Sequence, residues 1–141
     1  IADSIAVILA DTYVLYLKTQ NFHWNVGGMN FETLHLMFEK QYNELAEEID
    51  LIAERIRALG LPVRATFIAF GKLSTIKDED TVPGARDMVS ILCDGHEMIV
   101  RKVREVIPAF EKLHDGASVD VMNRQLQYHE KTAWMLRSLM A

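Results

Sequence analysis

The run from Asn30 to Leu59 constrains the fold most, because it holds neither glycine nor proline. Asn30 is a favourable N-cap residue, Glu32 lies in the first turn, and Gly60 and Pro62 follow the run. Apolar side chains recur within it at helical spacing: Leu34, Phe38, Leu45, Ile49, Ile52 and Ile56. The pattern predicts one long helix from Asn30 to about Leu59, with one apolar stripe in a core.

Metal-ligating side chains share one face of this predicted helix. At about 100° per residue, His35, Glu39, Asp50 and Glu54 lie near 0°, 40°, 60° and 100°. His23 adds a second imidazole before the Gly27-Gly28 turn. Imidazole with carboxylate oxygens suits iron, manganese or zinc. The sequence therefore predicts a metal site built from His23, His35, Glu39, Asp50 and Glu54.

One chain cannot close such a site if the helix is continuous. Glu39 and Asp50 are eleven residues apart, which is about 16 Å along a helix. A second copy packed antiparallel would bring its Asp50 end against the His35 end of the first. A two-fold axis near Glu44 and Leu45 would then generate two identical sites, each shared between two subunits.

Two other interpretations of the same residues stay open. Asp50 and Glu54 could form surface ion pairs with Arg55, Arg57 or Arg64. Alternatively, Glu32-x-x-His35 and Glu111-x-x-His114 match the pattern of di-iron bundles, which would place a site within one subunit. His114 precedes Asp115-Gly116, however, where a histidine also suits a helix C-terminus. His96 and His129 each indicate helix-packing or surface positions rather than ligands.

The remaining segments also favour helices. One helix is predicted from about Asp3 to Trp24, and a short one within the connection from Leu61 to Val82. A third runs from Pro83 toward His114, and Ser118 caps a fourth that ends near Met140. The predicted fold class is all-α: a ferritin-like four-helix bundle, one domain over residues 1–141, with a short extra helix in the crossover between helices two and three.

Composition excludes several other classes. The 141 residues contain one cysteine, so no intrachain disulfide forms, and a reducing cytosol is expected. No apolar run approaches the roughly 20 residues that span a bilayer, and acids stand near the start where a secretory signal has bases. A formal net charge of −5 disfavours a general nucleic-acid surface, although a basic arm preceding Ile1 would escape this argument.

Three motifs closely resemble the Dps family, the mini-ferritins also called DNA-binding proteins from starved cells. The first two are NFHWNVGGMNFETLH and MFEKQYNELAEEIDLIAERIRALG, and the tail YHEKTAWMLRSL is similar to the last helix of that family. The resemblance implies a hollow shell of twelve subunits. It also implies oxidation of ferrous iron, usually with hydrogen peroxide, at the two-fold dimer interface, and storage of the ferric mineral inside the shell.

The same resemblance assigns residues by position. It implies that His23 and His35 come from one subunit, and Asp50 and Glu54 from the other. Glu39 stands where the family more often has aspartate, so its contact is open.

Further residues are assigned in the same way. Trp24 matches the tryptophan beside the site. Asp120 and Asp115 match the acidic three-fold pores through which iron would pass, although Asp120 would also suit the first turn of the last helix.

The predicted function is therefore a ferroxidase and iron-storage protein that protects against oxidative stress. Each intersubunit site is expected to hold at most two iron ions, with zinc as a competitor. Glu44, Glu47 and Glu48 are candidate acids for mineral nucleation. The expected location is the cytoplasm, with the nucleoid as a second location, and DNA binding is expected to be weak. The alternatives are a non-catalytic DNA-compacting or structural shell, or an intrasubunit di-iron oxidoreductase.

Overall fold

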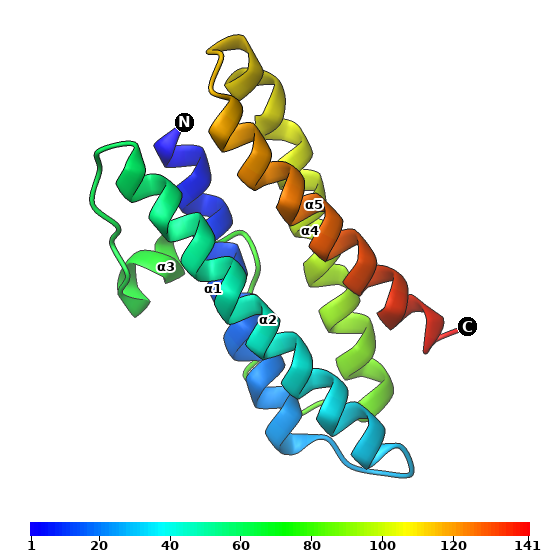
Figure 1. Ribbon diagram of the computed structural model, residues 1–141. Coiled ribbons are helices and arrows are strands. Elements are labelled where there is room, and N and C mark those ends of the chain that lie inside the picture. Colours follow the sequence, from blue (N-terminus) through cyan, green and yellow to red (C-terminus); the bar gives the residue numbers. More distant parts are fainter.

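Four long helices form a bundle, and a short fifth helix lies in the crossover between its two halves (Figure 1). The computed structural model describes all residues from 1 to 141. The helices are α1 (Ala2–Asn25), α2 (Phe31–Ala58), α3 (Phe67–Leu73), α4 (Ala85–Lys112) and α5 (Gly116–Ser138). There is no strand. This architecture confirms the ferritin-like fold class and the short crossover helix that the sequence predicts.

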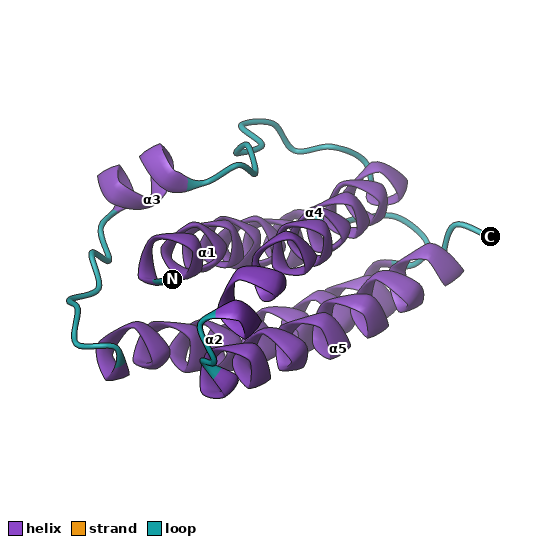
Figure 2. Ribbon diagram, turned by 90° about the horizontal axis from the view of Figure 1, so that it is seen from above, coloured by secondary structure: helices purple, strands orange, loops and turns teal.

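The helices form two layers, which Figure 2 shows from above the view in Figure 1. One layer contains α1 and α4, and the other contains α2 and α5. Helix α3 and its connections lie on the α1 side, so no segment of the chain covers the outer face of α2. No helix is both long and apolar enough to cross a membrane.

The apolar stripes meet in the middle of the bundle. On α2, the predicted core residues Leu34, Phe38, Leu45, Ile52 and Ile56 are buried, and Ile49 packs half-buried against them. Helix α1 contributes Leu15, which packs against Gly95 of α4. A Cβ atom at Gly95 would approach the Leu15 Cδ1 atom to 2.8 Å, so glycine permits this close approach of α1 and α4.

The caps of two helices differ from the sequence prediction. Asn30 holds the N-cap position of α2 as expected, but its side chain makes no capping hydrogen bond. Ser118 is not the cap of α5. The cap is Asp115, whose carboxylate accepts from the Ser118 backbone N–H at 3.1 Å and from its hydroxyl at 2.6 Å. Helix α4 ends at Lys112, before His114 and Asp115-Gly116, and Gly116 is the first residue of α5.

A buried carboxylate on α1 anchors the crossover. Asp11 is 1% exposed and accepts hydrogen bonds from the backbone N–H of Thr75 and Ile76 and from the hydroxyls of Ser74 and Thr75. These bonds satisfy a charge that would otherwise be costly to bury. The segment that follows α3 is thereby held against α1.

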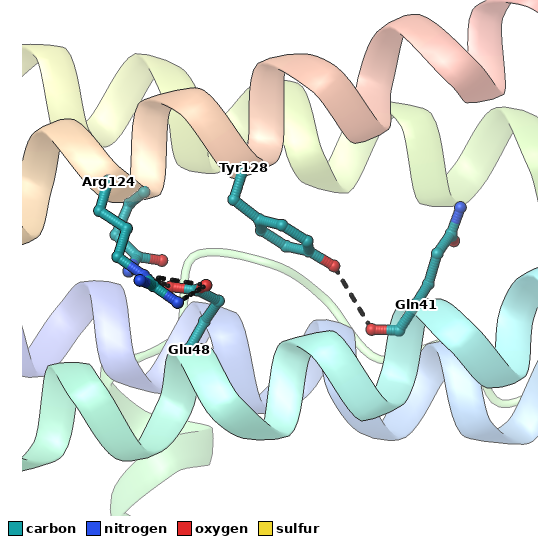
Figure 3. A network of polar contacts seen from close by, with 5 residues as sticks. Gln41, Glu48, Arg124 and Tyr128 are labelled. Carbon is teal, nitrogen blue, oxygen red and sulfur yellow. Dashed lines mark hydrogen bonds and ion pairs between the residues drawn. The ribbon is translucent and has the colours of Figure 1, made fainter.

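A second buried carboxylate joins α2 to α5 (Figure 3). Glu48 is 5% exposed and pairs with Arg124 at 3.1 Å, while Gln125 donates to its other oxygen at 2.7 Å. Farther along, the Tyr128 hydroxyl donates to the Gln41 carbonyl oxygen at 3.4 Å. Because its oxygens are engaged inside the bundle, Glu48 is unsuited to mineral nucleation, contrary to the sequence expectation.

Candidate metal centre

Two histidines stack and exchange hydrogen bonds across the α1–α2 turn. His23 lies in the last turn of α1 and His35 near the start of α2, and their rings stack with centroids 3.9 Å apart and 13° between planes. The His23 Nδ1 donates to the His35 carbonyl oxygen at 2.7 Å, and the His35 Nδ1 donates to the His23 carbonyl oxygen at 2.8 Å. The two predicted imidazole ligands are therefore adjacent.

These hydrogen bonds select the tautomer of both rings. A carbonyl oxygen only accepts, so each Nδ1 carries the proton and each Nε2 keeps its lone pair. Neither Nε2 has a hydrogen-bond partner within the chain. A hydrogen bond from the far ring nitrogen is the usual means by which proteins orient a metal-binding imidazole. The pair is thus arranged to present both Nε2 atoms to a metal ion.

The predicted acidic ligands lie on α2 and take part in no salt bridge within the chain. Glu39 is half-buried, and Asp50 and Glu54 are exposed. The surface ion-pair interpretation is wrong for Arg55 and Arg57, because Arg55 pairs with Asp115 at 3.1 Å and Arg57 donates to the Leu61 carbonyl oxygen. Arg64 forms no salt bridge either. These carboxylates are therefore free for another partner.

The chain by itself gathers no complete metal site. Helix α2 is continuous from Phe31 to Ala58, so the separation of about 16 Å between Glu39 and Asp50 stands. No three histidine, cysteine or acidic side chains lie close enough to hold one ion. The structure brings His23 and His35 together and leaves Asp50 and Glu54 apart from them, on a helix face that the chain does not cover.

The two-fold axis is expected to cross α2 at the level of Glu44 and Leu45. Leu45 is fully buried in the core, as its place in the apolar stripe predicts, and Glu44 is half-buried, so other residues form the outward face at this level. At the same level of α2, Asn43 and Ala46 are exposed and lie near 80° and 20° on the helical wheel that puts His35 at 0°. They occupy the outward face between the two groups of ligands.

The two Glu-x-x-His motifs lie at opposite ends of the bundle. His114 is exposed beyond α4, with φ of 56°, and the adjacent Asp115 contacts Arg55 near the end of α2. His35 is twenty residues before Arg55 on the same helix, which corresponds to about 30 Å. The intrasubunit di-iron alternative built on these motifs is therefore wrong.

The remaining predicted residues lie at the surface. Trp24 is 63% exposed and makes no ring contact with His23 or His35. Asp120 is exposed on α5, whereas Asp115 is engaged as a cap. Hydrogen bonds from Ser118, with Arg55 nearby, hold the pKa of Asp115 below its ordinary value. Only Asp120 of the two is free to act in a pore.

A second histidine pair lies inside the bundle. The sequence predicted no contact between its two members. His96 and His129 are fully buried, with their Nδ1 atoms 2.8 Å apart and no partner for either Nε2. Burial lowers the pKa of His96 to about 3. Burial, with His96 nearby, also lowers the pKa of His129. The sequence signal was available, because His96 falls on the α4 stripe of Leu92, Ile99 and Val103.

Comparisons with known proteins agree with this geometry. The ferritin-like domain family matches residues 3–141. A DNA protection during starvation protein of Brevibacillus brevis is 34% identical, over 96% of this chain and 94% of its own length. Another from Bacillus anthracis is 36% identical, over 94% of this chain and 90% of its own length.

Solved structures show the same likeness. A Dps protein of Vibrio cholerae, described as a ferritin-like diiron-carboxylate protein, has a TM-score of 0.96 at 28% identity, covering 99% of this chain and 88% of that one. A Dps structure from Bacillus brevis also has a TM-score of 0.96, at 33% identity, covering 99% of this chain and 94% of that one. Sequence motifs, fold and relatives therefore converge, and this chain belongs to the Dps family of ferritin-like proteins.

Proposed function

We propose that the chain is the subunit of a ferroxidase mini-ferritin, which oxidises ferrous iron at sites shared between two copies and stores the ferric product inside a homo-oligomeric shell. The observation that carries the proposal is the histidine pair, whose Nε2 atoms are free, while Asp50 and Glu54, which would complete the site, lie about 22 Å and about 28 Å from His35 along α2. Family membership supports iron as the metal and a shell, with twelve subunits expected.

In this proposal each side chain has a distinct task. His23 and His35 bind ferrous iron through Nε2, and Asp50 and Glu54 of a second copy complete the shell of ligands. Carboxylate oxygens are hard, anionic donors, so they favour the ferric state. Glu39 contributes directly or through water. Zinc competes for the same donors, because imidazole and carboxylate also suit zinc.

Hydrogen peroxide is the proposed oxidant. Two ferrous ions each give one electron to one peroxide, which takes up two protons and leaves two water molecules and two ferric ions. Because both electrons arrive together, no hydroxyl radical is released. Exposed acids such as Glu47 then supply oxygen ligands for the growing mineral, while Asp120 draws cations toward the shell.

The first test is direct. The protein is loaded with ferrous iron without oxygen, peroxide is added, and ferric absorbance is followed together with particle mass. Asp50→Asn should abolish fast oxidation because it replaces an anionic ligand with a neutral amide. Asp94→Asn, an exposed aspartate on α4, is the matched control and should oxidise iron at the wild-type rate. Fast oxidation in a double Asp50→Ala and Glu54→Ala variant would sink the proposal.

The second test asks whether the site is shared. His35→Ala subunits are co-assembled in equal amounts with Asp50→Ala subunits, each of which is inactive alone. In a mixed dimer with shared sites, one site carries both substitutions and the other carries neither. Random pairing should therefore restore about one quarter of the wild-type sites. No recovery would indicate sites within single subunits, and a non-catalytic shell would oxidise no iron in any mixture.

A further inference from the structure

Aromatic rings form a continuous row that begins at the histidine pair. The centroid distances are 5.3 Å from His23 to Tyr42, 6.1 Å from Tyr42 to Tyr16 and 5.5 Å from Tyr16 to Tyr13. A last step of 4.9 Å joins Tyr13 to Phe70 of α3. Each spacing lies within the range of direct aromatic contact. The row passes from His23 on α1 to Tyr42 on α2, returns to α1 at Tyr16, and then follows α1 away from the site.

The row is rich in tyrosine. The chain has four tyrosines, and three of them stand in this line, directly after a proposed iron ligand. All three are half-buried, and Gln20 donates to the Tyr16 phenol oxygen at 3.4 Å. The row ends at Phe70, which is buried and has no phenol to oxidise. Packing alone would be satisfied by phenylalanine at each of these positions, whereas phenols can also give up an electron and a proton.

We propose that Tyr42, Tyr16 and Tyr13 form an electron relay, which supplies the second electron to peroxide when a site holds only one ferrous ion. The inference rests on the proposed ferroxidase function and extends it to incompletely loaded sites. Such sites are the hazardous ones. A single ferrous ion gives peroxide one electron and leaves a ferric ion, hydroxide and a hydroxyl radical.

The relay changes the products of that reaction. One ferrous ion, one peroxide, one proton and the Tyr42 phenol yield one ferric ion, two water molecules and a neutral phenoxyl radical on Tyr42. The phenol gives the second electron, and its O–H proton goes to a peroxide oxygen. Tyr16 then gives an electron and a proton to Tyr42, which regains its phenol, and Tyr13 does the same for Tyr16.

The direction of the row moves the oxidising equivalent away from the ligands. Tyr13 stands ten residues before His23 on α1, about 15 Å along the helix. A radical on Tyr13 therefore lies well apart from both imidazoles. Trp24 is adjacent to His23 in sequence but is largely exposed and has no ring contact with the pair, so this chain offers it no equivalent path.

The experiment compares two iron loadings. Shells holding one ferrous ion per site, or two, receive one peroxide per site without oxygen. They are frozen and examined by electron paramagnetic resonance, while hydroxyl radical is measured in parallel with a spin trap. Wild-type protein with one ion per site should show an organic radical whose signal narrows when the tyrosines are ring-deuterated. With two ions per site the radical should be absent.

Conservative variants distinguish the relay from packing. Tyr42→Phe keeps the ring but removes the phenol, so the radical should be lost and trapped hydroxyl radical should rise at one ion per site. Tyr16→Phe should retain the radical on Tyr42, with altered hyperfine splitting. Tyr128→Phe removes the one tyrosine outside the row and should leave the signal unchanged.

The outcomes separate this inference from the function on which it rests. Ferric iron without a tyrosyl radical, a radical that survives Tyr42→Phe, or one lost instead in Trp24→Phe would overturn the relay and leave the ferroxidase proposal standing. If no ferric iron forms at either loading, the ferroxidase proposal fails and the relay fails with it.

Discussion

At the scale of single residues, His23 and His35 are held by main-chain carbonyls rather than by carboxylates. Their tautomers and orientation therefore depend on the α1–α2 turn and on no acidic side chain. Substitution of Asp50 or Glu54 should leave the histidine half of the site intact. This independence is the physical reason that complementary variants are expected to restore activity when they are mixed.

Asp115 and Asp120, both predicted to be pore residues, have different surroundings: Asp115 is engaged as a cap, whereas Asp120 is exposed. Asp115→Ala removes the α5 cap and the partner of Arg55, so it should lower the free energy of unfolding by about 1 kcal/mol. Asp120→Ala should change it little, since the side chain is exposed. Denaturant unfolding at equal protein concentration measures both. Equal stability of the two variants would contradict the assignment of the cap.

Asp120→Asn should instead slow iron uptake. An exposed carboxylate attracts ferrous ions through a field that salt screens over about 10 Å at 0.1 M. The slower uptake should therefore be clear at low ionic strength and disappear as salt is added. The check is the rate of ferric absorbance after ferrous iron is mixed with assembled shells. An unchanged rate at low ionic strength would remove Asp120 from the iron path.

At the scale of elements, α2 has three faces with different surroundings. One face carries the core stripe, a second joins α5 through Glu48, and the third carries the acids proposed as ligands and is not covered by the chain. Helical periodicity separates these faces by rotation, so one helix can meet all three demands. The short helix α3 contributes few core residues and depends on the hydrogen bonds that Asp11 accepts.

Asp11→Asn should loosen the crossover selectively. The amide has one acceptor oxygen and two N–H donors, so it cannot accept all the bonds that the carboxylate accepts. We expect the free energy of unfolding to fall by about 1.5–3 kcal/mol, the range for hydrogen bonds to a charged group. Amide hydrogen exchange should also accelerate in Phe67–Leu73. Asp3→Asn, also on α1 and without such bonds, is the control, and equal exchange rates in both variants would contradict the anchoring role.

At the scale of the whole molecule, the buried His96–His129 pair makes stability depend on pH. The pKa of both histidines is lowered in the folded state, so the unfolded chain binds more protons below its own pKa of about 6.5. The stabilisation is complete above that pH and declines as pH falls toward about 3.

The lowered pKa values of the two histidines predict how steeply the free energy of unfolding falls with pH. Between pH 6 and 4 the free energy of unfolding should fall by about 1.4 kcal/mol per pH unit for each buried histidine. Chemical denaturation at several pH values measures it. A His96→Leu and His129→Leu double variant should lose that part of the slope, whatever its absolute stability. A slope unchanged by the double variant would show that other groups control acid unfolding.

The negative charge of the assembly opposes DNA binding. Residues 1–141 carry −5 and no lysine-rich segment, and copies of the chain add their negative charges. Phosphate binding requires lysine or arginine side chains that release counterions, so we expect no tight complex with duplex DNA. A gel shift at low salt is the measurement. Tight retention of DNA by this chain would contradict the expectation.

Local patterns in the sequence determined much of this protein. Periodic apolar residues and the Gly27-Gly28 turn predicted the helices, and the spacing on α2 predicted that one chain cannot close the metal site. Those signals are local because helix geometry relates neighbours three and four residues apart. The motifs around His23, His35 and Asp50 also identified the family, which the comparisons confirm.

Only the tertiary structure decided what individual polar residues do. It engaged Glu48 with Arg124, paired Asp115 with Arg55, and joined His96 to His129. It also directed the Nδ1 atoms of His23 and His35, the two imidazoles of the proposed metal centre, to each other's carbonyl oxygens. The contacts of Glu48 with Arg124, of Asp115 with Arg55 and of His96 with His129 join residues on different helices, 33 or more positions apart in the sequence. Periodicity gives the face on which a side chain lies but not the partner that meets it there.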